Sequence, residues 1–139
     1  MSEVLVKEEI NASADAVWDL VSDFGGVLKW SSVIESCDVE GDGIGAVRTL
    51  RMAGGPAIVE RLESLDDATK TFSYVIVEGP LPVSDYLASL KVSDRGADRC
   101  EVEWGSSFEP AGVPEEQAVG IIRGVYEGGI KGIRKALEK

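Results

Sequence analysis

Residues 47–62 read VRTLRMAGGPAIVERL, and this stretch decides the fold. Two runs of alternating apolar and polar residues flank the turn sequence AGGP, a pattern typical of an antiparallel β-hairpin. Side chains alternate between the faces of a strand, and directly opposed residues share a face. Setting Leu50 opposite Ile58 therefore places Arg48 opposite Glu60. The hairpin predicts a charged pair on the same inward face as two apolar side chains.

The same pairing rule extends this charged pair into a row of polar side chains. Turn sequences separate β-rich segments from Val33 to Glu109, which predicts a meander of six strands. Continuing the register pairs Glu60 with Tyr74, Tyr74 with Tyr86, and Tyr86 with Ser106. The apolar neighbours on the same face are Leu50, Ile58, Ile76 and Phe108 on one side and Leu62, Phe72, Ala88 and Trp104 on the other.

A polar row on an inward face has two interpretations. Buried charges are costly unless they are paired or hydrated, so Arg48 and Glu60 form either a purely structural ion pair or part of a cavity wall. An apolar cavity with a few convergent polar groups is typical of small-molecule sites. The second interpretation predicts a ligand site on the concave face of the sheet.

Helical patterns flank the predicted meander. Residues 3–10 are β-rich, Ser13 is a predicted N-cap of a short helix, and a second short helix runs toward Trp30. Pro114, which is favoured at the first helical position, opens a long C-terminal helix. Its predicted apolar face consists of Ile122, Val125, Tyr126, Ile130, Ile133 and Leu137. This face needs a surface to cover, and the sheet provides one.

Glycine recurs at every fourth position of the long helix. The repeat comprises Gly120, Gly124, Gly128 and Gly132. Each glycine costs roughly 1 kcal/mol of helix propensity relative to alanine. Two interpretations are open: a flexible flank that faces solvent, or room beside the sheet for a bound molecule at Gly128, Gly129 and Gly132.

Composition excludes several classes of function. The chain has 139 residues and 44% hydrophobic content, which predicts one domain over residues 1–139. Its formal charge of −11 disfavours nucleic acids and anionic membrane surfaces as partners. The chain has no histidine and no Cys-x-x-Cys motif, so we expect neither a metal site nor a cofactor. Without an apolar leader or spanning segment, we expect a cytoplasmic protein.

The turns fall into two groups at opposite ends of the meander. Residues 53–56, 79–82 and 110–114 form small turns rich in glycine and proline, whereas the other group is acidic. An entrance ringed by the first group would admit an apolar ligand. The gate residues would be Gly54, Gly55, Pro56, Gly79 and Pro80. The alternative is that these segments are simply tight turns.

Several segments together resemble a known family. They are the helix 17–24 with Trp30, the strand segments 45–48 and 59–62, Tyr74 with the turn 79–82 and Tyr86, Trp104, and the helix segment 125–129. Their order resembles the START and pollen-allergen-like superfamily, more narrowly its bacterial polyketide cyclase/dehydrase and lipid-transport group. The resemblance covers essentially the whole chain.

The resemblance implies an α+β helix-grip fold. A curved antiparallel seven-stranded sheet would wrap around the long C-terminal helix, with two short helices between the first and second strands. The cavity between sheet and helix would bind lipids, polyketides, hormones or other aromatic compounds. The predicted ligand-binding residues are Arg48, Leu50, Ile58, Glu60, Phe72, Tyr74, Ile76, Tyr86, Ala88, Trp104, Ser106, Phe108, Tyr126 and Gly129. The turn at 53–56 sits where related plant hormone receptors carry a gating loop.

Binding and catalysis make different demands on Glu60. In a carrier or sensor, Arg48, Tyr74 and Tyr86 would orient an oxygen of the ligand. In a cyclase, dehydratase or isomerase, Glu60 would be the general base, and Arg48 or a tyrosine would stabilise an enolate. Close pairing of Arg48 with Glu60 favours binding without catalysis. A third alternative is that the rim rich in glycine and proline docks a protein partner, which an exposed Trp30 would favour. We expect a monomer or a weak homodimer.

Overall fold

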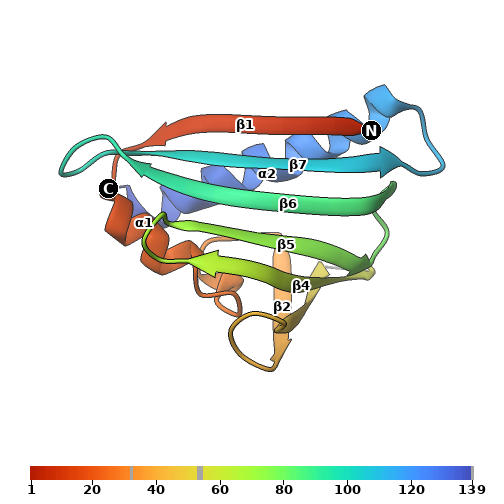
Figure 1. Cartoon of the computed structure of the whole chain (residues 1–139), viewed down its shortest axis with the longest axis horizontal. Coiled ribbons are helices and arrows are strands. Elements are labelled where there is room, and N and C mark those ends of the chain that lie inside the picture. The colour runs from red at the N-terminus through yellow and green to blue at the C-terminus, as the bar shows by residue number, and fades with distance from the viewer. Residues whose placement is uncertain (32, 53–54, 139) are drawn as a thin grey trace.

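The backbone forms one curved sheet and one long helix. A computed structural model describes residues 1–31, 33–52 and 55–138. Seven antiparallel strands lie in the order β1-β7-β6-β5-β4-β3-β2 (Figure 1). The strands are β1 (Ser2–Ile10), β2 (Ile34–Glu40), β3 (Val47–Met52), β4 (Ala57–Asp66), β5 (Thr71–Glu78), β6 (Val83–Asp94) and β7 (Cys100–Pro110).

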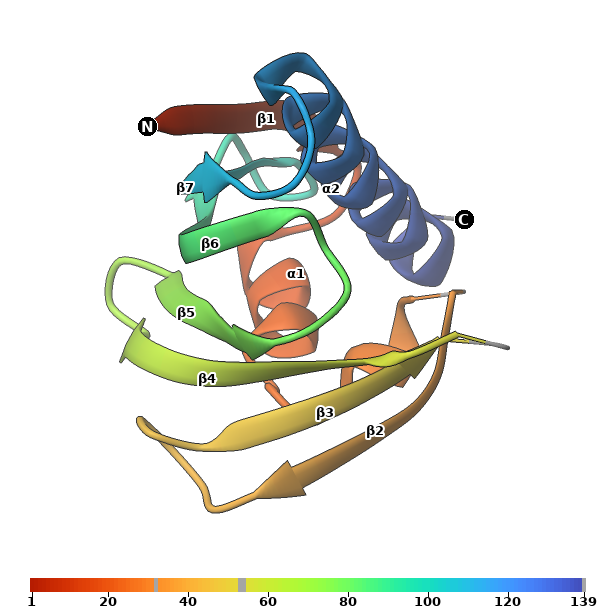
Figure 2. The same ribbon diagram turned by 90° about the vertical axis from the view of Figure 1, so that its right-hand side faces the viewer.

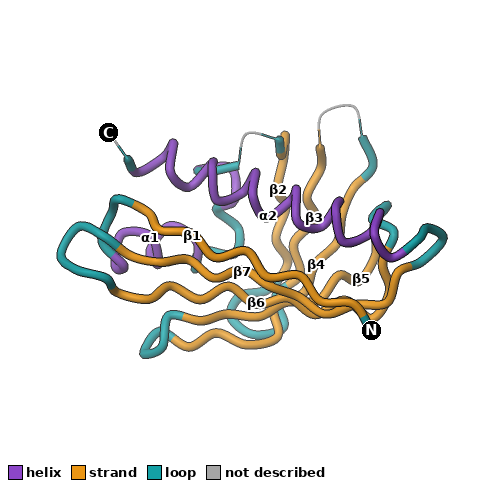
Figure 3. Tube along the Cα trace, turned by 90° about the horizontal axis from the view of Figure 1, so that it is seen from above, coloured by secondary structure: helices purple, strands orange, loops and turns teal. Residues whose placement is uncertain are grey.

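The long helix α2 (Glu115–Leu137) lies on one side of the curved sheet. Figure 2 shows the sheet bending around the space below α2, and Figure 3 shows the helix running along that side. The short helix α1 (Ala14–Val21) lies on this same side, near one end of the sheet. The second short helix is a single 3-10 turn, η1 (Val27–Lys29). The predicted helix-grip fold is confirmed.

Local sequence explains where the two α-helices begin. The Ser13 hydroxyl accepts a hydrogen bond from the backbone N–H of Ala16 at 3.1 Å and caps α1, as predicted. Pro114 is the N-cap of α2 with extended backbone, so the prediction that it is the first helical residue is off by one position. The buried face of α2 consists of Ala118, Ile122, Tyr126, Ile130 and Ile133. This face packs on the sheet and supplies much of the core.

The predicted register holds for the first hairpin and shifts beyond it. Arg48 lies opposite Glu60 and Leu50 opposite Ile58, as expected from the turn. Across β4 and β5, Glu60 lies opposite Ile76 instead of Tyr74. The turn after β4 sets Asp66 opposite Thr71, and one extra residue in β4 between Leu62 and Ser64 brings the net shift to two residues. A shift of two residues leaves each side chain on the expected face.

The register of β6 with both neighbouring strands also differs from the prediction by two residues, because the turn after β6 sets Asp94 opposite Cys100 and Lys91 pairs with Thr71. Tyr74 lies opposite Ala88, and Ala88 opposite Ser106, so Tyr86 opposes neither of its predicted partners. The bulge between Ser84 and Leu87 inserts one extra residue into β6. Tyr86 nevertheless stays buried on the inner face.

The two edge strands of the sheet, β1 and β2, have different neighbours. Beside β1, Arg134 of α2 donates to Glu8 at 2.6 Å and to the carbonyl oxygen of Glu9 at 2.7 Å. At the opposite edge, β2 pairs with β3 alone. Among the described residues, no helix has the length and apolar character needed to cross a bilayer.

Candidate functional site

A cavity of about 890 Å³ lies between the sheet and α2. Side chains of β3 to β7 form one wall: Arg48, Leu50, Met52, Ile58, Glu60, Tyr74, Ile76, Tyr86 and Trp104. The flank of α2 forms the second: Ile121, Ile122, Gly124, Val125, Gly128, Gly129, Lys131, Gly132, Lys135 and Ala136. Residues 27–31, Val33 and Ile34 form the third wall, and Leu81 joins it from the β5–β6 turn. The volume is in the range of small-molecule pockets.

The charged pair at the cavity wall is almost fully buried. Arg48 is 5% exposed and Glu60 is 7% exposed. Arg48 Nε and Nη2 lie 2.8 and 2.7 Å from the same oxygen, Glu60 Oε1. Arg48 Nη1 donates to the carbonyl oxygen of Phe24 at 3.0 Å, and the guanidinium lies 4.0 Å from the centre of the Phe24 ring. The guanidinium is thus held by an ion pair, a carbonyl and an aromatic face.

This geometry decides which atoms are available to a ligand. Arg48 donates from Nε to Glu60 and from Nη1 to Phe24, and Nη2 lies in the ion pair, so at least two of its five N–H groups have no acceptor among the described residues. Glu60 Oε1 takes two of these contacts, whereas Oε2 accepts no hydrogen bond from the described residues. The cavity wall therefore offers one carboxylate oxygen as an acceptor and the remaining Arg48 N–H groups as donors.

The inner end of the cavity is aromatic. Trp104 stacks on Tyr126 with ring centres 4.6 Å apart, and its indole Nε1 donates to the Tyr74 hydroxyl at 3.0 Å. The hydroxyl groups of Tyr86 and Tyr126 form a hydrogen bond with each other. The Ser106 hydroxyl is buried and has no partner among the described residues. Within the predicted polar row, Arg48 and Glu60 pair with each other, whereas the partners of Tyr74 and Tyr86 lie outside the row.

Alkaline titration tests this burial. Burial raises the pKa of Tyr126 to about 12 and the pKa of Tyr74 and Tyr86 well above their ordinary value of 10.0. The unfolded chain therefore loses phenolic protons first, and the stability from these groups is complete below pH 10 and falls as the pH rises toward about 12. Near-ultraviolet absorbance of native and urea-unfolded protein measures the shift. Coincident titration curves would contradict it.

The glycines of α2 divide between contact and open space. A Cβ on Gly129 would lie 2.5 Å from the Trp104 ring, and a Cβ on Gly132 would overlap the carbonyl oxygen of Trp30. Gly124 and Gly128 line the cavity and have no atom near their missing Cβ. Of the three glycines expected to leave room for a ligand, Gly128 has open space at its missing Cβ, whereas Gly129 and Gly132 make room for Trp104 and Trp30.

The structure separates the predicted ligand-binding residues into two groups. Nine line the cavity: Arg48, Leu50, Ile58, Glu60, Tyr74, Ile76, Tyr86, Trp104 and Gly129. The other five lie outside the described lining: Phe72, Ala88, Ser106, Phe108 and Tyr126. Phe72 and Phe108 stack on Tyr74 and Tyr86 from behind, with ring centres 6.0 and 6.2 Å apart. This second group supports the wall.

The predicted gate residues lie away from the cavity wall where they are described. Gly55, Pro56, Gly79 and Pro80 are absent from the described lining, although their neighbours Met52 and Leu81 belong to it. Gly54 lies outside the described residues. A gating role for these turns stays a prediction.

Sequence reasoning missed one wall of the cavity and most of another. Residues 27–31, Val33 and Ile34 have no periodicity that assigns them a face, so their placement had no local signal. On α2, the glycine repeat indicated Gly128, Gly129 and Gly132 but not Ile121, Lys131 or Lys135, which line the same flank.

Trp30 is 8% exposed and packs edge-on against Trp104 at 6.0 Å, so the exposed tryptophan that would favour docking of a protein partner is not found.

Comparison with known proteins identifies the class to which this fold and cavity belong. A model of the family described as "Polyketide cyclase / dehydrase and lipid transport" matches residues 1–138. The chain belongs to this family, which confirms the resemblance that the sequence motifs indicated.

Relatives of known structure or name are similar over much of the chain. The abscisic acid receptor PYL6 of Arabidopsis thaliana is 31% identical over 100 residues, 68% of this chain and 46% of the receptor. The match to this receptor and to PYL2 spans about half of their length, 46% and 50%. The solved structure of XoxI from Bacillus cereus has a TM-score of 0.92 at 31% identity and covers 99% of this chain and 96% of that one. Norcoclaurine synthase from Thalictrum flavum shares the fold, with a TM-score of 0.74 at 20% identity, covering 96% and 84%.

Proposed function

We propose that the protein binds a small apolar or aromatic molecule in the cavity between the sheet and α2. The observation that carries this proposal is the cavity itself: about 890 Å³, walled mostly by apolar side chains and floored by a buried ion pair. Burying apolar ligand surface there supplies about 25 cal/mol per Å² removed from water.

The floor of the cavity favours a ligand with a hydrogen-bond donor at its inner end. Glu60 Oε2 is an acceptor without a partner in the described chain, and each Arg48 nitrogen already makes one contact with Glu60 or Phe24. A hydroxyl, phenol or amine of the ligand matches that oxygen, and a carboxylate would be repelled by it. Arg48 keeps further N–H groups, so its expected role in orienting an oxygen of the ligand stays a prediction.

The relatives support binding of small molecules of this kind. PYL6 is named as a receptor of abscisic acid, and norcoclaurine synthase has been solved in complex with dopamine and hydroxybenzaldehyde. The family description includes lipid transport as well as cyclase and dehydrase activity. These relatives span receptors, carriers and enzymes, so the geometry of Glu60 has to distinguish between binding and catalysis.

That geometry favours binding over acid–base catalysis. Two guanidinium nitrogens lie within 2.8 Å of Glu60 Oε1, so this oxygen is committed to the ion pair instead of facing a ligand proton. The hydroxyl groups of Tyr74 and Tyr86 are also engaged, by Trp104 and Tyr126. The cyclase, dehydratase or isomerase alternative would require a ligand that displaces Arg48 from Glu60.

Filling the mouth of the cavity tests the proposal. Val125 lines the cavity and is 45% exposed, so a Val125→Trp side chain has room to enter without disturbing the core. We expect this variant to bind the neutral probe N-phenyl-1-naphthylamine at least about tenfold more weakly than the unchanged protein, a loss of about 1.4 kcal/mol. Fluorescence titration measures the affinity.

A matched variant separates blocking from a general effect of added tryptophan. Val77 is 53% exposed on β5 and lies outside the described cavity lining, so Val77→Trp should bind the probe as the unchanged protein does. Native mass spectrometry of freshly purified protein should also detect a co-purified small molecule that Val125→Trp loses. Equal probe binding by the two variants would refute the cavity as the binding site.

A further inference from the structure

The cavity is the positively charged part of an acidic protein. Of the 25 acidic residues of the chain, all of them in the described part, Glu60 alone lines the cavity. Four cationic residues line it: Lys29, Arg48, Lys131 and Lys135. The wall therefore carries an excess of positive charge although the chain has a formal charge of −11. A positively charged cavity wall in a negatively charged chain attracts anions to that wall.

Two of these cations have carboxylate partners, and two have none at ion-pair distance among the described residues. Glu60 neutralises Arg48, and Asp23 lies 3.2 Å from Lys29 Nζ. No carboxylate of the described residues lies within 4.0 Å of Lys131 or Lys135. These lysines are four residues apart on α2, an arrangement in which like charges repel each other. A bound anion between them would remove that repulsion.

The lysines mark the open end of the cavity. Lys131 and Lys135 are exposed, as are Gly128 and Val125 beside them, whereas Arg48 is buried. An anionic group therefore reaches the lysines without losing all of its water. At the buried ion pair it would instead lose its water and meet the Glu60 carboxylate, which offsets the charge of Arg48. The two ends of the cavity thus select opposite ends of a ligand.

A further donor lies in the wall beside this part of α2. The indole Nε1 of Trp30 is buried without a hydrogen-bond partner in the described chain, and Trp30 lines the cavity. The Trp30 backbone packs directly against Gly132, between the two lysines in sequence. An unpartnered buried N–H is costly unless a ligand or water accepts from it. This group adds a second polar requirement that an acceptor-rich ligand satisfies.

We infer that the ligand is an amphipathic anion, whose apolar or aromatic body fills the cavity and whose acidic group binds Lys131 and Lys135 at the mouth. Carboxylate, sulfonate and phosphate groups share the required chemistry. The inference rests on the proposed binding function and adds the charge and the orientation of the ligand.

A pair of probes that differ in a single acidic group tests the inference. 8-Anilinonaphthalene-1-sulfonate carries a sulfonate, and N-phenyl-1-naphthylamine has the same aromatic body without it. The unchanged protein should bind the sulfonate probe more tightly. The double variant Lys131→Gln/Lys135→Gln should weaken binding of the sulfonate probe by roughly 3- to 20-fold, as expected for two exposed ion pairs. Its affinity for the neutral probe should change by less than about twofold.

A second double variant controls for net charge. Arg51→Gln/Lys91→Gln removes the same two positive charges from exposed residues outside the described lining, and should leave both affinities unchanged. Raising the ionic strength should weaken sulfonate binding more in the unchanged protein than in the Lys131/Lys135 variant. If that variant binds both probes like the unchanged protein, or if the two double variants behave alike, the anion subsite is refuted and cavity binding stands. If neither probe binds the unchanged protein, both proposals fail.

Discussion

Replacing Arg48 with methionine should lower the free energy of unfolding by about 3–5 kcal/mol, the usual cost of breaking a buried ion pair. The substitution leaves the Glu60 carboxylate buried with no counter-charge, and it removes the donor to the carbonyl oxygen of Phe24. Methionine fills a comparable volume beside the Phe24 ring, so loss of packing contributes little. Urea denaturation at neutral pH, followed by circular dichroism, measures the change.

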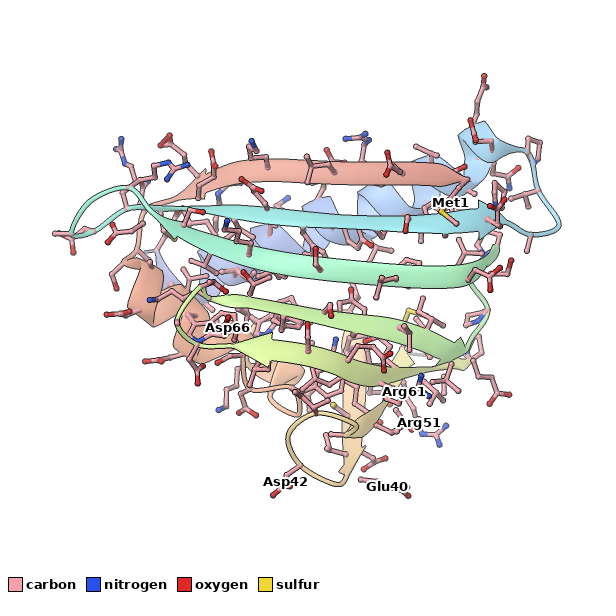
Figure 4. All side chains as sticks on the ribbon, in the orientation of Figure 1. Met1, Glu40, Asp42, Arg51, Arg61 and Asp66 are labelled. Atoms are coloured by element: carbon pink, nitrogen blue, oxygen red, sulfur yellow. The ribbon has the colours of Figure 1, made fainter. Side chains whose placement is uncertain are left out.

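Two controls separate the unpaired charge from other effects. Arg61→Met breaks an exposed ion pair, 2.8 Å long, between Arg61 and Glu63, and should cost less than about 1 kcal/mol. Arg48 and Arg61 come from neighbouring strands, and Arg61 extends away from the body of the molecule (Figure 4). The double variant Arg48→Met/Glu60→Leu should recover most of the lost stability, because no charge remains buried. An Arg48→Met cost as small as that of Arg61→Met would show that the pair is effectively hydrated.

Gly132→Ala should lower the free energy of unfolding by about 2–3 kcal/mol, although alanine is the better helix former. A Cβ at this position overlaps the carbonyl oxygen of Trp30, which is backbone and cannot rotate away. Either α2 or the segment after η1 has to move, and Trp30 forms part of the cavity wall. Thermal and urea denaturation should show the loss, together with a change in tryptophan fluorescence.

The same substitution elsewhere on α2 should have the opposite sign. Gly120 has no atom within 4 Å of its missing Cβ, so Gly120→Ala should raise the free energy of unfolding by about 1 kcal/mol. Both variants replace glycine with alanine, so the effect on the entropy of the unfolded chain is the same and cancels when the two are compared. If Gly132→Ala is as stable as Gly120→Ala, the close packing of α2 against Trp30 is not present in solution.

The part of the site that the sequence predicts is the part fixed by one short turn. The hairpin of β3 and β4 places Arg48 opposite Glu60, because the four residues between its strands leave few registers. Burial of these two side chains follows from the apolar residues Leu50 and Ile58 on the same face. The hairpin sequence alone therefore predicts the chemistry at the floor of the cavity.

Register beyond this hairpin was not predictable in detail. The turns set Asp66 opposite Thr71 and Asp94 opposite Cys100, and bulges change the pairing by one further residue. The alternation of side chains gives no local sign of either. Asp85 adopts a φ of 51°, a conformation that aspartate tolerates better than most residues, but this preference is too weak to predict a bulge. The apolar faces survived these shifts because core burial selects the face more strongly than the exact partner.

The mouth of the cavity escaped prediction for a different reason. It is formed by residues 27–31, Val33 and Ile34, which include a single 3-10 turn, and by a flank of α2 that is neither apolar throughout nor polar. Lys131 and Lys135 fit the general rule that cations stabilise a helix C-terminus, so they carried no separate signal in the sequence. Only their placement on the cavity wall distinguishes them from ordinary terminal charges.

The free edge of β2 has a consequence for how the molecule behaves when crowded. Unpaired backbone groups along an outer strand invite a second molecule to extend the sheet, a common route to aggregation. Here the strand exposes Glu35, Asp38 and Glu40 within seven residues. A like strand laid alongside would bring carboxylates together, and their mutual repulsion keeps the edge from templating intermolecular β-structure.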